Sequence, residues 1–182
     1  MLKKLKVSLT IFLTLFVTSA AAIAFADDDE DCNERDGFER VEVSGTGIHD
    51  FNTVIVHRDR KKPNWQKTIT TETIDLSGDL EGRVLYQPVG VYDFVEGTLV
   101  NTGRQVFSGT ILGSRPVMLF DDEYRFDVNL HTGEVLGRAY LTERLSGPRI
   151  RCEIEIRGGD TPSVDNRTSS TYKGVCWIRK KA

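Results

Sequence analysis

The stretch RIRCEIEIR (residues 149–157) decides the fold, because its side chains alternate strictly between apolar and charged. Ile150, Cys152, Ile154 and Ile156 share one phase, and every residue between them is Arg or Glu. Successive side chains of a β-strand point to opposite faces, so the alternation predicts a strand with one buried and one hydrated face. The charged face argues against an outer-membrane barrel, which turns an apolar band toward lipid.

A second stretch, TYKGVCWIR (residues 171–179), predicts the last strand of the chain. One phase of it holds Tyr172, Gly174, Cys176 and Ile178. Cys152 and Cys176 can therefore point to the same side of neighbouring strands, which is the precondition for a disulfide, and we predict that they pair. Cys32 is the third cysteine, and three states stay open for it: a free thiol, a bond between chains, or competition for one of the other two.

The rest of the chain after the N-terminal segment also shows the alternation that is typical of β-strands. Short alternating segments are separated by Gly, Asp, Asn and Pro, and no helical stripe is present. About nine or ten segments qualify as strands, in meander order with short connections. This pattern predicts an all-β fold, a single antiparallel β-barrel of about eight strands with an apolar interior and no exposed edge.

The first 26 residues, MLKKLKVSLTIFLTLFVTSAAAIAFA, have the parts of a secretory signal peptide. A basic beginning precedes an apolar core, and Ala24-Phe25-Ala26 places small residues at a cleavage site. The core is shorter than the roughly 20 residues of a membrane-spanning helix, so cleavage after Ala26 is favoured over an uncleaved anchor. We expect a secreted or periplasmic protein, with an acidic leader over residues 27–37 and one barrel domain over residues 38–182.

The net charge of the chain indicates which kinds of partner it can bind. The whole chain of 182 residues has a net charge of −3, and the segment 1–26 contributes three Lys and no acid. The remaining 21 basic and 27 acidic side chains give a net charge of −6. A basic face for nucleic acid is therefore not expected. Nothing after residue 26 is apolar and long enough to span a membrane, and the sequence leaves a homodimer open.

Several motifs are absent. The acidic leader fails as an EF-hand, because setting Gly37 at position 6 puts Cys32 at position 1 and Val43 at position 12, where carboxylates are needed. Cys32 follows Asp-Glu-Asp, which also argues against a lipoprotein. The three histidines (His49, His57 and His131) are too scattered to indicate zinc. We expect no metal and no cofactor.

The best candidates for chemistry are polar groups on the inner face of the barrel. In VYDFVEGTLV (residues 91–100), Tyr92, Phe94 and Glu96 fall in one phase. A carboxylate among aromatic rings has a raised pKa and can act as a general acid or base. Glu96 and Tyr92 are therefore candidate catalytic residues. The simpler interpretation, which we favour, is that the aromatic rings are core and that Glu96 turns outward at a strand end.

Ligand-binding candidates follow from the same alternation of phases. They are Tyr86, Phe94 and Tyr140, and Arg104 is a further candidate for the barrel lining. We expect these side chains to line the barrel if the barrel is hollow.

The stretch DLSGDLEGRVLYQPVGVYDFVEGTLVNTGRQVFSGTI (residues 75–111) resembles the calycin-like barrels related to allene oxide cyclases and dirigent proteins. The resemblance covers residues 70–111 and depends on the rhythm of glycine-rich strands. It implies an eight-stranded antiparallel barrel with a central cavity. Characterised members of this group are cyclases, isomerases or stereochemical guides for small molecules. No catalytic motif matches residue by residue, so no active-site assignment follows from it.

Three functions are compatible with these patterns. The leading expectation is an exported, soluble barrel that binds a small apolar or amphipathic molecule in its cavity. The second is a cyclase or isomerase that acts on such a ligand, with Glu96 and a Tyr as acid–base groups. The third is a structural or protein-interaction barrel with a filled core. Whether the interior is open decides between the first two and the third.

Overall fold

The computed structural model describes residues 37–158 and 165–180. The predicted signal peptide, almost all of the acidic leader and Cys32 lie outside these residues, so their assignments stay predictions. Among the described residues, no helix is long and apolar enough to cross a membrane.

The described chain is all-β, with one short 3-10 helix, η1 (Phe51–Thr53). Some strands run the full length of the sheet, and others are short because they are interrupted. The strands are β1 (Phe38–Asp50), β2 (Ile55–Lys62), β3 (Trp65–Gly78), β4 (Leu80–Asp93), β5 (Thr98–Ile111), β6 (Val117–Asp121), β7 (Arg125–Asn129), β8 (Val135–Leu141), β9 (Glu143–Ser146), β10 (Ile150–Gly158) and β11 (Arg167–Arg179).

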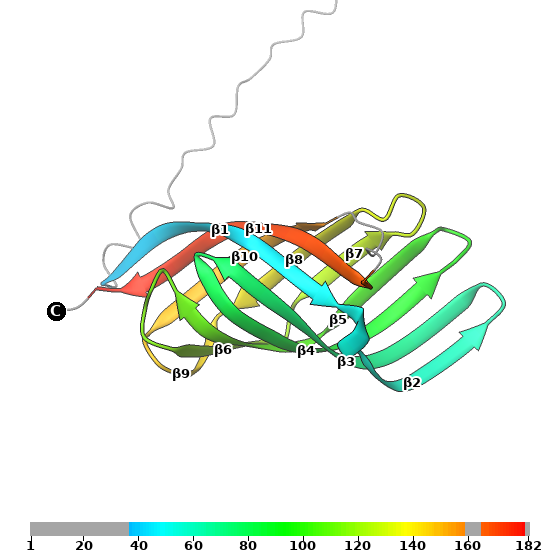
Figure 1. Ribbon diagram of the computed structural model, residues 1–182, viewed down its shortest axis with the longest axis horizontal. Helices are drawn as coiled ribbons and strands as arrows, with labels where there is room; N and C mark the ends of the chain where they lie inside the picture. Colours follow the sequence, from blue (N-terminus) through cyan, green and yellow to red (C-terminus); the bar gives the residue numbers. More distant parts are fainter. Residues whose placement is uncertain (1–36, 159–164, 181–182) are drawn as a thin grey trace, which may run out of the picture.

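The sheet closes on itself as an antiparallel barrel (Figure 1). Each strand of the ring pairs with the next in the order β1, β11, β10, β8, β7, β5, β4 and β3, and β3 pairs back with β1. The ring therefore has eight positions, as the strand pattern predicted. Four of the eight neighbouring pairs are consecutive strands, and the pairing of β1 with β11 joins the first and the last of the described strands.

The remaining strands extend positions of this ring. β6 and β7 both pair with β5, at different places along it. β9 continues β8 and pairs with β6. β2 pairs with β3 beyond the end of β1, after the break at η1. At the right of Figure 1, the β2–β3, β4–β5 and β7–β8 hairpins project beyond the paired ends of β1 and β11, and we call this end of the barrel the mouth.

The end of the barrel away from these hairpins is packed solid. Its centre is formed by buried apolar side chains of β4, β5, β6 and β10, and the disulfide belongs to the same cluster. They include Leu80, Phe107, Ile111, Val117, Leu119 and Ile150.

The predicted Cys152–Cys176 disulfide is present and fully buried. The two residues lie directly opposite each other in the β10–β11 register, which explains why they can be bridged without distortion of the pairing. The predicted phase of β10 is also confirmed: Cys152 and Ile154 are buried, and Arg151 and Glu153 are exposed.

Tyr172 connects opposite sides of this packed end. Its hydroxyl accepts the backbone N–H of Leu80 at 2.7 Å and lies 3.2 Å from the carbonyl oxygen of the same residue. Gly45 gives it room, because a Cβ at that position would lie 2.3 Å from the hydroxyl oxygen. The tyrosine thus links β11 to the start of β4.

Candidate functional site

The half of the barrel next to the mouth encloses a cavity of about 490 Å³. The interior is therefore packed at one end and hollow at the other, and it does not have the filled core of the third expectation. Most of the wall is apolar and comes from strands all around the ring. The apolar residues that line it include Ile74, Leu99, Phe126, Val128, Val135 and Ile156.

A row of polar side chains crosses four neighbouring strands inside the barrel. Glu72 of β3 is opposite Tyr86 of β4, Tyr86 is opposite Gln105 of β5, and Gln105 is opposite Asp121 of β6. Residues that are opposite in antiparallel strands point to the same face, so the register itself gathers the row. Three of the four residues line the cavity, and Asp121 lies behind it.

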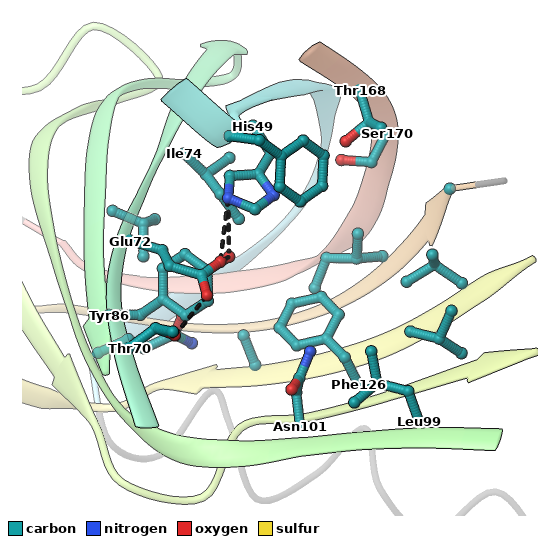
Figure 2. A pocket seen from close by; sticks show the side chains of 18 of the residues that line it. His49, Thr70, Glu72, Ile74, Tyr86, Leu99, Asn101, Phe126, Thr168 and Ser170 are labelled. Carbon is teal, nitrogen blue, oxygen red and sulfur yellow. Dashed lines mark hydrogen bonds and ion pairs between the residues drawn. The ribbon is translucent and has the colours of Figure 1, made fainter. Parts of the chain in front are cut away.

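Glu72 is the centre of the polar cluster that reaches the cavity (Figure 2). Its Oε2 accepts the Tyr86 hydroxyl at 2.7 Å and lies 3.0 Å from Nε2 of His49. Its Oε1 accepts the hydroxyl of Thr70. The side chains of Glu72 and His49 are each only 14% exposed, so the cluster is largely removed from water.

The hydrogen bonds decide the charge of this cluster. Burial alone raises the pKa of Glu72, but hydrogen bonds from His49, Thr70 and Tyr86 outweigh it, and the pKa falls below its ordinary value of 4.5. Burial, together with the neighbouring Glu72 charge, raises the pKa of Tyr86 well above its ordinary value. At neutral pH, Glu72 is therefore an ionised acceptor and Tyr86 a protonated donor.

His49 is held at the end of β1 by the structure that follows it. Asp50 accepts the backbone N–H of Asn52 and starts the η1 turn, and the ring of Phe51 lies 4.1 Å from the His49 ring, centre to centre. Since ionised Glu72 can only accept, Nε2 of His49 must carry the proton that it shares with Glu72. Nδ1 is then an acceptor in the neutral ring, and it has no hydrogen-bond partner among the described residues.

Asp121 is a structural acid. Its Oδ2 accepts the Gln105 side-chain amide at 2.7 Å and the backbone N–H of Tyr140 at 2.8 Å, and its Oδ1 accepts the N–H of Glu123. These bonds fix the break between β6 and β7 and also hold the Gln105 side chain in place. Asp121 itself is 3% exposed and has no free face toward a ligand.

Two of the residues proposed from the sequence lie at the cavity. Tyr86 and Tyr92 line it. Burial raises the pKa of the Tyr92 phenol, although a hydrogen bond with Thr68 acts in the opposite direction. Tyr86 contacts Glu72 directly, whereas Tyr92 stacks on Phe94 with ring centres 5.9 Å apart.

Glu96 and Phe94 do not line the cavity, and both are exposed. β4 ends at Asp93, whose Oδ1 accepts the N–H groups of Val95 and Glu96 and starts a turn. The alternation that placed Glu96 inside therefore stops three residues before it. The favoured interpretation of Glu96, outward at a strand end, agrees with this position.

Arg104 and Tyr140 do not line the cavity either. In both places the neighbouring residue faces inward instead. Gln105 is buried beside the exposed Arg104, and Ala139 is buried beside the half-buried Tyr140. The inner phase at these two places is therefore that of Gln105 and Ala139.

Sequence reasoning missed Glu72 and His49. His49 could have been found, because it continues the phase of Val41 and Val43 along β1. Glu72 gave no usable signal, since it lies in a run of threonines in which neither phase is distinctly apolar.

Comparisons with family models, with curated proteins and with solved structures give no match to this chain. Within the described ranges, no three His, Cys, Asp or Glu side chains are grouped as metal ligands would be. The fold and the site thus define a closed antiparallel barrel with a largely apolar cavity and one buried, ionised carboxylate on its wall.

Proposed function

We propose that this protein is an exported barrel that binds one small apolar or amphipathic molecule in its cavity. The observation that carries the proposal is the cavity of about 490 Å³, which lies within the range of sites for small molecules. Apolar walls favour such a ligand because each buried CH₂ group contributes about 0.8 kcal/mol.

Two further features support this proposal. A buried disulfide suits an oxidising compartment such as the periplasm or the cell exterior, as the predicted signal peptide requires. The resemblance to calycin-like barrels related to allene oxide cyclases and dirigent proteins also favours a ligand inside the barrel.

One contact favours a second candidate, a cyclase or isomerase that acts on the bound molecule. His49 lies 3.0 Å from Glu72 at the cavity wall, so Glu72 can hold the imidazole while Nδ1 takes a proton from a ligand. In this version of the enzyme hypothesis, His49 and Glu72 replace Glu96 as the acid–base groups. It requires chemical change of the ligand, which mass spectrometry of the bound molecule before and after incubation would detect.

The binding proposal is tested with Nile red, a neutral dye that fluoresces in apolar surroundings. We expect saturable binding to the wild-type protein and at least a tenfold loss of affinity in Val128→Trp, because the indole would occupy the cavity beside Phe126. Val106→Trp is the matched control, since Val106 lies on the outer face of β5 and does not line the cavity.

Native mass spectrometry of the protein purified from its own host provides a second test. A retained small molecule that is absent from Val128→Trp would support the proposal. Equal dye binding by wild type and Val128→Trp, with no retained molecule in either, would contradict it.

A further inference from the structure

The charge inside the cavity limits which head group a ligand can carry. Among the described residues that line the cavity there is no Lys or Arg, and the one carboxylate is Glu72. An anionic ligand would therefore bring a second negative charge into a largely apolar space and find no lysine or arginine to pair with. Like charges are costly in such surroundings because the low dielectric strengthens their repulsion.

The hydrogen-bonding capacity of the cluster points the same way. Thr70, Tyr86 and His49 already direct their protons at Glu72, so none of these three donors is available to a ligand. When the imidazole is neutral, the groups left over are acceptors: Nδ1 of His49 and the remaining lone pairs of the Glu72 carboxylate. A ligand that reaches this wall must donate a hydrogen bond to satisfy them.

The remaining polar groups of the wall are neutral. They are hydroxyl and amide side chains, such as those of Thr68, Asn101, Gln105 and Ser170. Such groups both donate and accept, so they do not discriminate between head groups by charge. The selection therefore depends on Glu72 and His49.

We propose that the cavity selects amphipathic molecules whose head group is a neutral or cationic hydrogen-bond donor, such as an alcohol or an amine, and rejects carboxylates of the same chain length. The head group lies against Glu72 and His49, and the apolar part lies along the wall formed by Leu99 and Phe126, which face the cluster in Figure 2. This inference depends on the proposed function, because it names the ligand class of the same cavity.

The test uses three probes with one chain: decanol, decylamine and decanoate. Each displaces Nile red from the wild-type protein at pH 8, where an aliphatic carboxylate is ionised and imidazole is ordinarily neutral. We expect decanol and decylamine to bind at least about tenfold more tightly than decanoate, a difference that corresponds to about 1.4 kcal/mol.

Glu72→Gln tests the cause of the selectivity. The substitution removes the charge and keeps the shape, so we expect the preference against decanoate to fall to within about threefold. Glu153→Gln is the matched control, because Glu153 is exposed on the outer face of β10, and it should keep the wild-type preference. Circular dichroism would establish that both variants fold. Should Glu72→Gln fail to fold, the order of the three probes on the wild-type protein still decides the matter.

The outcomes separate this inference from the proposed function. Equal or tighter binding of decanoate by the wild type would overturn the head-group inference while leaving a ligand-binding barrel. An unchanged preference in folded Glu72→Gln would overturn the role of Glu72. Failure of Nile red and all three probes to bind would overturn both proposals.

Discussion

Removal of the Cys152–Cys176 bridge should destabilise the protein by an amount that follows from its loop. The two cysteines are separated by 24 positions, and cross-linking the ends of a loop of about 25 residues lowers the entropy of the unfolded chain by an amount worth about 3.5 kcal/mol at 25 °C. In the double variant Cys152→Ala/Cys176→Ala, loss of two fully buried sulfurs adds to the cost, so about 3.5 kcal/mol is the minimum expected.

Urea unfolding followed by circular dichroism measures this loss. With a denaturant slope of about 2 kcal/mol per M, the midpoint should fall by about 1.7 M or more. A loss under about 2 kcal/mol with an unchanged slope would refute the reasoning. It would mean that the unfolded chain keeps β10 and β11 together without the bridge, so that the bridge removes little freedom.

Three further predictions concern the polar interior. The folded-state pKa of Glu72 lies below its ordinary value of 4.5. Its contribution to stability is therefore present above pH 4.5 and is lost as the pH falls through the folded-state pKa. Between pH 7 and pH 3, urea unfolding should show a smaller loss of stability for Glu72→Gln than for the wild type. Tyr86→Phe removes a donor to a buried carboxylate and should cost about 1.5–3 kcal/mol in the same assay. Tyr124→Phe should be neutral or stabilising, because the Tyr124 hydroxyl is buried without a partner among the described residues; a cost as large as that of Tyr86→Phe would contradict this account.

The packed end of the barrel could be predicted from the sequence because hydrophobic contrast is strong there. In β10, Ile and Cys alternate with Arg and Glu along the strand, so phase, burial and the disulfide all followed from one pattern. Burial of apolar surface drives folding, and at this end the inner face is the apolar face.

The hollow end could not be predicted in the same way. There the inner face contacts a cavity, so Thr70 and Glu72 can face inward without apolar packing around them. The alternation of apolar and polar residues therefore no longer identifies the inner face. The turn after Asp93 interrupts the phase before Glu96, which the sequence pattern did not show. Glu72 and His49 are 23 positions apart in the sequence, and only the pairing of β1 with β3 brings them together.

The division of the barrel into a packed and a hollow half has a consequence for how this protein can change. The disulfide and the apolar centre lie in the packed half, so these stabilising contacts are separate from the cavity wall around the mouth. Replacing a mouth residue such as Val128 leaves those contacts untouched. Under the proposed function, one scaffold can therefore acquire new ligands by substitution around the mouth, without each change having to be compensated in the core.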